Sequence, residues 1–443
     1  MISIHDLIQQ EQTRQDTGFQ LIPSENQSSP AVMEAVGSCV ANKYAEGYPG
    51  RRYYEGNDLV DQIETAAQEF AKSVYKVPHA NLQPYSGSPA NAAAYMAMAE
   101  PGSPILGLKL SSGGHLTHGQ PIITFSGRYY RSIQYGLNEH DRIDLEEVRR
   151  LAQEHRPAVM VIGTTAYPFH LPYAEFAQIA QEVGAYVLAD ISHLSGLVAG
   201  GALESPVPYA DVVMLTTHKT LRGPRGAILM VTDKGLQKDP ELASKIDKAV
   251  FPGMQGGPHL NAIAGVAIAL QEASTPEFQA YATQVLENAK ALAAALQKRG
   301  IALVGGGTDN HLMIMDFSAF GGGTQMAYAM AQIGLYANKN TIPREPYSAF
   351  YPSGVRIGTP WVTTIGMKPV DMEHLASWIS QVAEIVQHDV MPQEKSERTR
   401  FVKQFKKQIA SDPRILKLRQ EVAEVRKQFH PRFPSLDTHT KQP

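Results

Sequence analysis

The chain has 443 residues, 43% of them hydrophobic, which is more than one hydrophobic core usually organises, so we expect two or more domains. A formal net charge of −3 gives no electrostatic reason to expect nucleic acid or an anionic membrane as a partner. The single cysteine, Cys39, excludes an internal disulfide and a metal site built from several cysteines.

The first twenty residues predict an amphipathic helix rather than a targeting signal. Polar and apolar residues alternate there, without a charged segment followed by an apolar stretch. The sequence also lacks the run of about 18 apolar residues that a membrane span requires. We therefore expect a soluble, cytoplasmic protein, with residues 1–25 forming an N-terminal helical arm.

The next segments predict an α/β fold with a parallel sheet. Residues 145–155 and 173–184 space their apolar residues three and four apart, which is typical of crossover helices, and Gly184 is the expected end of the second. Short runs rich in Val, Ile and Leu predict buried strands at 103–108, 158–164, 185–190, 211–217 and 226–231. Such alternation of strands and helices indicates a sheet with helices on its faces.

The C-terminal part predicts a smaller unit. A long helical pattern covers residues 278–299, and residues 311–317 and 355–360 resemble strands. A final helix is expected after Asp412 as N-cap and Pro413 in its first turn, and the last dozen residues are expected to be loose. We therefore expect a large domain over 26–280 and a small domain over 281–443.

Lys219 is the first candidate catalytic residue. It follows a predicted buried strand and is therefore expected at the carboxyl end of the sheet, where open α/β folds bind ligands. A lysine amine partly shielded from water has a lowered pKa and becomes a nucleophile toward aldehydes. For an isolated lysine a surface position is the more common explanation, so the interpretation depends on the neighbouring motifs.

One such motif is a candidate phosphate site. Ser86, Gly87 and Ser88 precede an alanine-rich helix, whose free N–H groups and dipole would hold an anion. Serine before a helix is often only an N-cap. Taken alone, this motif is weak evidence for a ligand.

Asp190 and His193 form a second candidate motif. Asp190 ends a predicted strand, and its carboxylate could keep a heterocyclic nitrogen protonated, as a pyridoxal cofactor requires. A metal site is the alternative, but no third ligand lies nearby in the sequence. A capping or purely structural aspartate is the other alternative.

Two further residues complete an ordered set. His115 could stack on an aromatic cofactor, while Gly113 and Gly114 would let backbone approach a ligand. Arg356 could grip a substrate carboxylate through two hydrogen bonds. Each residue also has a structural explanation, but the order of phosphate turn, histidine, aspartate, lysine and arginine is specific.

The sequence resembles the serine hydroxymethyltransferase family of pyridoxal-phosphate enzymes, which has the type I aminotransferase fold. The resemblance is close from about residue 20 to residue 385. Its motifs are LIPSEN, NKYAEGYPGRRYY, SGSPAN, GGHLTHG, ISHLSGL, TTHKTLRGPRG, FPGMQGGP, GGTDNHL, NKNTIP and GVRIGTP. It implies a large domain with a mostly parallel seven-stranded sheet flanked by helices, and a smaller α/β C-terminal domain.

The resemblance implies roles around pyridoxal 5'-phosphate. Lys219 would hold the cofactor as an imine, Asp190 would pair with its ring nitrogen, and His115 would stack on the ring. His193 would lie near the phenolic oxygen, with Thr165 in the place of the family's usual serine. The other implied cofactor contacts are Ser86, Gly87, Ser88, Thr216, His218 and, from a partner subunit, Gly256 and Gly257.

The resemblance also implies how the substrates are held. Ser24 and Arg356 would bind the carboxylate of the amino acid. Tyr44, Glu46 and Tyr54 would act in the neighbouring subunit's site, so the active unit would be a homodimer or a dimer of dimers with shared active sites. Glu46 is the candidate for proton transfer, with a pKa raised by partial burial. The implied folate-facing wall contains Leu110, Gly114, Leu116, Asn340, Ser348, Ala349 and Phe350.

The implied activity is a one-carbon transfer. L-Serine and tetrahydrofolate would be converted reversibly into glycine and 5,10-methylenetetrahydrofolate. The sequence departs from the usual family pattern at Glu55, Ser111, Ser112, Thr165, Ser192 and Ser195. These departures leave open an α-methylserine hydroxymethyltransferase, a folate-independent β-hydroxy amino acid aldolase, or a regulatory protein that binds the cofactor without catalysis.

Overall fold

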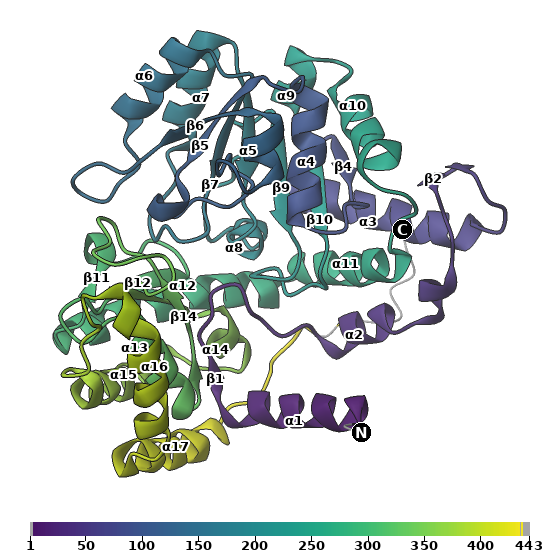
Figure 1. Cartoon of the computed structure of the whole chain (residues 1–443). Helices are drawn as coiled ribbons and strands as arrows, with labels where there is room; N and C mark the ends of the chain where they lie inside the picture. Colours follow the sequence, from purple (N-terminus) through teal and green to yellow (C-terminus); the bar gives the residue numbers. More distant parts are fainter. Residues whose placement is uncertain (1–2, 435, 437–443) are drawn as a thin grey trace. The chain divides into compact units, whose positions relative to one another are not determined.

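The computed structural model describes residues 3–434 and 436, which form two compact units (Figure 1). The small unit contains the chain up to Asn26 together with Gln284–Arg432. The large unit contains Gln27–Thr283 with residues 433 and 434. Residues 435 and 437–443, which make up most of the tail expected to be loose, lie outside the described residues.

The N-terminal segment belongs to the small unit and is not a separate arm. Helix α1 (Ile4–Thr17) leads into strand β1 (Phe19–Gln20), which pairs in parallel with β13 (Leu335–Tyr336). The Arg426 guanidinium donates from Nε to the carbonyl of Gly18 at 3.0 Å. These contacts are non-local, so the sequence pattern of the first twenty residues does not predict them.

The large unit is built on the predicted seven-stranded sheet. Its order is β4 (His79–Asn81), β10 (Ala227–Val231), β9 (Val212–Thr216), β8 (Tyr186–Asp190), β7 (Val159–Gly163), β5 (Pro104–Leu108) and β6 (Arg131–Tyr135). The pairs from β9 to β6 are parallel, while β10 is antiparallel to both β9 and β4. All five strands predicted in this region are therefore confirmed, but β10 runs opposite to the parallel direction expected for it.

Helices pack around this sheet, as Figure 1 shows for α4 and α7. The predicted crossover helices are confirmed as α6 (Leu145–His155), whose first turn is capped by Asp144, and α7 (Tyr173–Val183), which ends at Gly184 in the left-handed region. The other α-helices of this unit are α2 (Pro30–Val36), α3 (Asp58–Tyr75), α4 (Gly87–Met98), α5 (Phe125–Tyr129), α8 (Ser195–Ala199), α9 (Asp233–Lys238), α10 (Leu242–Lys248) and α11 (Leu260–Ala273).

Shorter elements connect them. A hairpin of β2 (Gly47–Tyr48) and β3 (Arg51–Arg52) precedes α3, and η1 (Cys39–Asn42), η2 (Leu110–Ser112) and η3 (Ala249–Met254) are short helical turns. Helix α12 (Pro276–Lys298) begins in the large unit and ends in the small unit.

The small unit contains an antiparallel sheet in the order β11 (Ala302–Leu303), β12 (Leu312–Asp316), β15 (Gly354–Gly358) and β14 (Asn338–Asn340). Strands β12 and β15 and helix α17 (Pro413–Arg426) were predicted, and Asp412 accepts a capping hydrogen bond from the Arg414 N–H. Helix α16 (Lys395–Ala410) was not predicted, because mostly charged residues surround its buried Phe405 and Ile409. The other helices are η4 (Val304–Gly306), α13 (Gly323–Gln332), α14 (Pro360–Thr364), η5 (Pro369–Asp371) and α15 (Met372–Val386).

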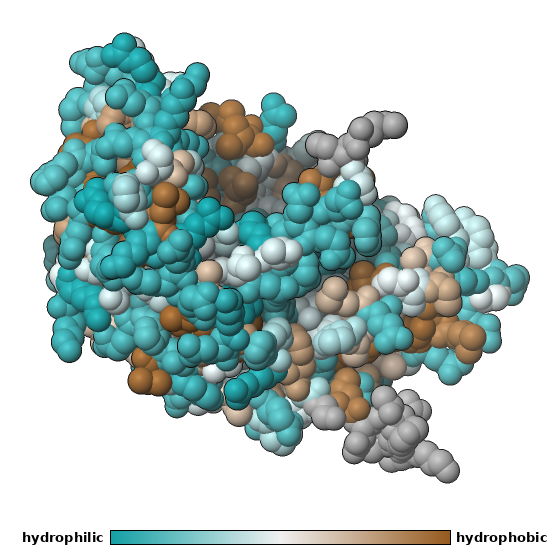
Figure 2. Space-filling model, turned by 90° about the horizontal axis from the view of Figure 1, so that it is seen from below, coloured by the Kyte–Doolittle hydropathy of each residue, from teal (hydrophilic) through white to brown (hydrophobic). Residues whose placement is uncertain are grey.

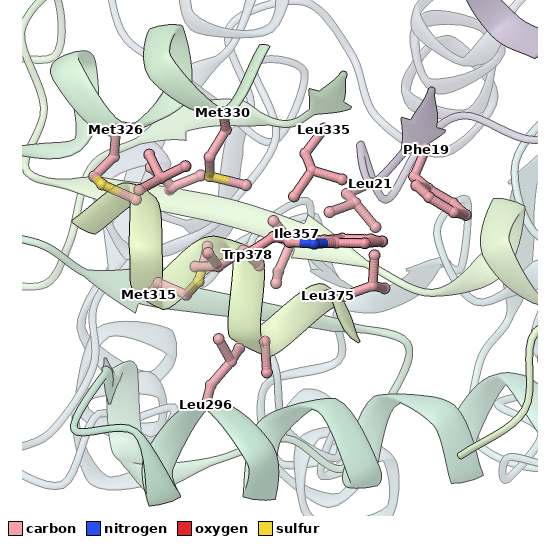
Figure 3. Close-up of a cluster of buried hydrophobic side chains, with 14 of the residues drawn as sticks. Phe19, Leu21, Leu296, Met315, Met326, Met330, Leu335, Ile357, Leu375 and Trp378 are labelled. Carbon is pink, nitrogen blue, oxygen red and sulfur yellow. The ribbon is translucent and has the colours of Figure 1, made fainter. Parts of the chain in front are cut away.

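Each unit has its own hydrophobic core. In the small unit Phe19 lies beside Trp378, with ring centroids 5.9 Å apart, among the buried side chains of Figure 3. In the large unit the core includes the strand residues Val159, Leu188 and Met214. On the face drawn in Figure 2, hydrophilic residues predominate and hydrophobic ones form separate areas. No helix in the described part of the chain is long and apolar enough to cross a bilayer.

Replacing Phe19 by Ala is expected to destabilise the protein by about 3–5 kcal/mol, because it removes a large side chain that is 0% exposed and leaves a cavity. Urea unfolding followed by circular dichroism would measure the loss. The control Ile4→Ala removes a side chain that is 71% exposed, and its midpoint should match that of the wild type. Equal midpoints for Phe19→Ala and the wild type would contradict the assignment of β1 to this core.

Candidate active site

The carboxyl ends of three adjacent parallel strands define the candidate site. Strands β7, β8 and β9 are neighbours in register, with Gly163 opposite Asp190 and Asp190 opposite Met214. Asp190 is the last residue of β8, Thr165 follows β7, and Lys219 follows β9. Because parallel strands end at one edge of a sheet, these residues are brought to the same edge.

Lys219 lies in the turn between β9 and the antiparallel strand β10. Its Nζ donates to Thr216 Oγ1 at 2.5 Å, and the residue is half-buried. The turn is tied to the loop after β8, since Thr220 Oγ1 donates to the His193 carbonyl at 3.0 Å and accepts from the Gly196 N–H at 2.9 Å. Both loops therefore hold Lys219 at the strand ends.

Asp190 is a buried carboxylate with four hydrogen bonds. Oδ2 accepts from His118 Nε2 at 2.9 Å and from Asn91 Nδ2 at 3.0 Å. Oδ1 accepts from the Ser192 N–H at 3.0 Å and from Ser192 Oγ at 2.6 Å. Burial by itself would raise the pKa of Asp190, but the hydrogen bond and charge of His118, with help from His115 and Ser192, lower it below the ordinary value. The carboxylate is therefore ionised at neutral pH.

The two histidines of the GGHLTHG motif lie beside Asp190. His115 Nδ1 and Thr117 Oγ1 are 2.7 Å apart, and the His115 and His118 rings meet edge to face. Burial, followed by the charge of His118, lowers the pKa of His115 to about 4, and nearby Lys219 acts in the same direction. His115 is therefore an uncharged ring at neutral pH.

His118 is oriented so that it donates to Asp190. Its Nδ1 lies 3.4 Å from the His115 backbone nitrogen, and its Nε2 faces Asp190 Oδ2 at 2.9 Å, so a proton on Nε2 is shared with the carboxylate. One possible metal-ligand atom from each of His115, His118 and Asp190 lies within 4.8 Å of the others, a spacing that would allow all three to bind one metal ion. The metal alternative considered from the sequence paired Asp190 with His193, whereas this grouping pairs it with His115 and His118.

The candidate phosphate turn lies against the same strand end. A Cβ built on Gly87 would lie 2.8 Å from Cγ2 of Thr216, the residue whose hydroxyl accepts from Lys219. Ser86 is the N-cap of α4, and its side chain makes no capping hydrogen bond within the described part of the chain. The first N–H groups of α4 are thus available to an anion close to Lys219.

Other predicted residues surround this group. The Thr165 N–H donates to the Gly113 carbonyl at 2.7 Å, which joins the loop of His115 to the end of β7. His218 is half-buried beside Lys219, and burial, together with the charges of Lys219 and Arg225, lowers its pKa to about 3. Among the residues predicted to face folate, Leu110, Gly114 and Leu116 belong to the same loop as His115, and both leucines are exposed.

A second group in the large unit contains the residues predicted to act in a partner's site. Tyr54 OH donates to Glu46 Oε2 at 3.4 Å, and the rings of Tyr44 and Tyr54 meet edge to face. A Cβ built on Gly256 would lie 3.3 Å from Glu46 Oε1, and one on Gly257 would lie 3.6 Å from the Tyr44 ring. The structure therefore gathers these five residues, and Figure 1 shows strand β2, which begins directly after Glu46, at the edge of the large unit.

The small unit holds the remaining predicted residues. Arg356 is buried on β15, its Nε donates to Asn338 Oδ1 at 3.0 Å, and burial lowers its pKa to about 10. Pro23, next to Ser24, packs against Gly358 at the end of the same strand. Lys339 precedes Asn340 and donates to the carbonyl of Phe350, so the segment from Ser348 through Ala349 to Phe350 lies close to β14.

Four residues around Asp190 had no role in the sequence-based interpretation. They are Asn91, Thr117, His118 and Ser192. Asn91 donates to both Thr117 Oγ1 and Asp190, and lies 99 residues from Asp190 in the chain. His118 stood in a quoted motif and could have been singled out as a second ring near the cofactor, but its partner depends on the fold.

Comparison with known proteins identifies the family of the chain. A family model described as serine hydroxymethyltransferase matches residues 2–379. A serine hydroxymethyltransferase from Acidothermus cellulolyticus is 51% identical over 386 residues, covering 87% of this chain and 88% of that protein. Relatives of the same name from Desulfotalea psychrophila and Sorangium cellulosum are each 50% identical, covering 86% of this chain and 88% and 89% of their own lengths. The chain therefore belongs to the serine hydroxymethyltransferase family.

Proposed function

We propose that the protein is a pyridoxal-phosphate-dependent serine hydroxymethyltransferase. It converts L-serine and tetrahydrofolate reversibly into glycine, 5,10-methylenetetrahydrofolate and water. The observation that carries this proposal is the meeting of a lysine amine, an ionised aspartate and a helix N-terminus at one edge of the sheet, in a chain of this family. We assign the one-carbon chemistry to this edge.

The residues at this edge fit pyridoxal phosphate. The N-terminus of α4 with Ser86 and Ser88 suits a phosphate, and the missing side chain of Gly87 leaves room beside Thr216. The buried Oδ1 of Asn91 has no hydrogen-bond partner among the described residues. It could therefore accept a hydrogen bond from a ligand bound beside Asp190.

Each side chain has a definite task toward the cofactor. The chemistry that pyridoxal phosphate supplies when bound is an aldehyde and an electron-accepting ring, which together allow the Cα–Cβ bond of serine to break. Asp190 would hold a proton on the ring nitrogen, because four donors keep the carboxylate ionised and fixed. Lys219 would bind the aldehyde and release it to the amino acid. Uncharged His115 would cover the ring without competing for the ring proton.

Arg356 would bind the carboxylate of the amino acid, with Ser24 beside it. A guanidinium offers two parallel N–H donors to a carboxylate. The hydrogen bond from Arg356 Nε to Asn338 Oδ1 fixes the plane of this guanidinium. Burial strengthens this pairing because the dielectric constant around it is low. This arrangement selects an α-amino acid over an amine that lacks the carboxylate.

We further propose that a second copy of the chain completes each site. Glu46, Tyr44 and Tyr54 form a group with Gly256 and Gly257 in which Glu46 has a tyrosine hydroxyl as partner. Tyr44 and Tyr54 are exposed, and so are Met33 and Leu59 of the same unit. Such exposed apolar side chains suit a homodimer in which Glu46 of one subunit transfers protons in the other.

Purified protein given serine and tetrahydrofolate is expected to form glycine and methylenetetrahydrofolate, and Lys219→Ala is expected to reduce the rate by roughly 10³-fold or more. The variant should also lose the absorbance band of the lysine-bound cofactor. The control Lys290→Ala, an exposed lysine on α12, should behave as wild type. Parallel assays with α-methylserine and allo-threonine, each with and without folate, test the alternatives. Bound cofactor without turnover of any substrate would refute the proposal, and folate-independent cleavage of allo-threonine alone would make the protein an aldolase.

The free energy of unfolding should decrease as the pH is lowered, because of His115. The pKa of His115 is about 4 in the folded chain and near the ordinary value of 6.5 in the unfolded chain, so acidification from pH 7 to pH 5 favours the unfolded state. In cofactor-free protein, protonation of His115 should lower the free energy of unfolding by on the order of 1–2 kcal/mol between pH 7 and pH 5. His115→Phe should remove this contribution. Urea midpoints at both pH values measure the difference. His140→Phe, at an exposed histidine, should keep the wild-type dependence.

Mixing two inactive variants should restore activity if the sites are shared. Lys219→Ala removes the amine and Glu46→Gln removes the carboxylate. In a heterodimer of the two variants, one site combines Lys219 from one subunit with Glu46 from the other and is intact. After random subunit exchange about one quarter of wild-type activity should return. Differently tagged variants would show that heterodimers form. Heterodimers without recovered activity would mean that Glu46 and Lys219 serve the site from the same chain.

A further inference from the structure

An arginine with a buried side chain holds the backbone on both sides of Glu46, directly before the β2–β3 hairpin. Arg52 Nη1 donates to the carbonyl of Ala45 at 2.8 Å and to the carbonyl of Gly47 at 2.9 Å. These two carbonyls belong to the residues on either side of Glu46. The same guanidinium therefore fixes the backbone before and after Glu46.

The other side of the guanidinium is anchored to helix α3. Arg52 Nε donates to Asp61 Oδ1 at 2.8 Å, and Nη2 donates to Glu64 Oε2 at 2.5 Å. The side chains of Arg52 and Glu64 are 4% and 0% exposed. Burial opposes the charge of Arg52, but Glu64 and Asp61 outweigh it and raise the pKa of Arg52. The arginine is thus a charged bridge between α3 and the hairpin.

Gln83 links the same groups a second time. Its Nε2 donates to Glu64 Oε1 at 2.7 Å and to the Gly47 carbonyl at 3.0 Å. Gly47 has φ +97°, and a Cβ built there would lie 2.3 Å from the Arg51 carbonyl oxygen, so this turn requires glycine. The backbone beside Glu46 is therefore constrained from three directions.

Stability alone does not account for this arrangement. A buried ion pair costs much of its attraction in lost hydration, and apolar residues of similar size often hold a fold equally well. Apolar residues could not, however, fix the direction of two carbonyls. Planar bidentate geometry gives Arg52 that ability, which a lysine lacks.

We propose that Arg52, with Glu64 and Gln83, positions Glu46 for proton transfer in the neighbouring site. The inference rests on the proposed function, in which Glu46 performs that transfer. Arg52 touches neither Glu46's carboxylate nor any reacting group in this arrangement, so it is a positioning residue that acts through the backbone. The contact of Tyr54 OH with Glu46 Oε2 then sets the side chain on this fixed backbone.

A double-mutant cycle in the holoenzyme tests the proposal. Arg52→Lys keeps the charge but cannot bridge both carbonyls and both acids, so kcat should fall by about 10- to 100-fold with KM for serine little changed. In a Glu46→Gln background the same change should cost less than about twofold, because its effect passes through the carboxylate already removed. Radiolabelled serine followed over hours would quantify the slow variants.

The outcomes separate this inference from the proposed function. If Arg52→Lys slows Glu46→Gln by the same factor as the wild type, Arg52 has only a general structural role and the inference fails. If Glu46→Gln keeps full activity, the role of Glu46 fails and this inference with it. A wild type that does not turn over serine with tetrahydrofolate would instead refute the proposed function.

Two further variants guard the test against misfolding. Gln83→Met removes the hydrogen bonds to the Gly47 carbonyl and to Glu64 Oε1 but leaves both partners of the ion pair in place. It should lower kcat by about 3- to 10-fold in the wild type but not beside Glu46→Gln. The absorbance of the bound cofactor should stay unchanged in Arg52→Lys and Gln83→Met, because neither residue belongs to the group of side chains around Lys219. Arg149→Lys, at an exposed ion pair with Glu182, is the matched control and should keep wild-type kcat. A fall in kcat for Gln83→Met that persists beside Glu46→Gln would also overturn the proposal.

Discussion

The ionised carboxylate of Asp190 is the interaction on which the rest of the candidate site depends. A buried charge is costly unless several donors replace its lost water. Here the donors come from α4, from the loop after β5 and from the loop after β8. Satisfying one carboxylate therefore draws three segments of the chain together. The candidate phosphate turn and His115 reach the strand ends because they belong to these segments.

Much of the large unit could be predicted because parallel strands buried on both faces are continuous apolar runs. The runs ending at Asp190 and Thr216 were assigned almost to the residue, whereas β6 was missed because it is half-exposed and mixed in composition. The direction of β10 could not be predicted, since strand periodicity carries no information about direction. At the site, Lys219 and Asp190 stood out because they follow such runs. His118 and Arg52 did not, because their roles arise from partners that only the fold brings together.

The predicted functional residues separate into groups with different physical character. Lys219, His118 and Asp190 are buried or half-buried and make short hydrogen bonds, as the proposed binding of a rigid cofactor would require. Around Glu46 the predicted residues lie next to the β2–β3 hairpin, which Arg52 ties to α3. In the proposed function, a half-buried Glu46 on a rigid support is suited to act in the site of another subunit.

Ser192 shows how a departure from the family pattern can act at the centre of the site. Its hydroxyl donates to Asp190 Oδ1 at 2.6 Å, a bond that an alanine there could not make. Each added donor lowers the basicity of the carboxylate, so in the proposed function the aspartate would hold a proton on the cofactor's ring nitrogen less tightly by its own charge. The same donor also opposes rotation of the carboxylate, which would favour a fixed hydrogen bond to that nitrogen. The substitution thus exchanges basicity for orientation while it preserves the ionised state on which the site is built.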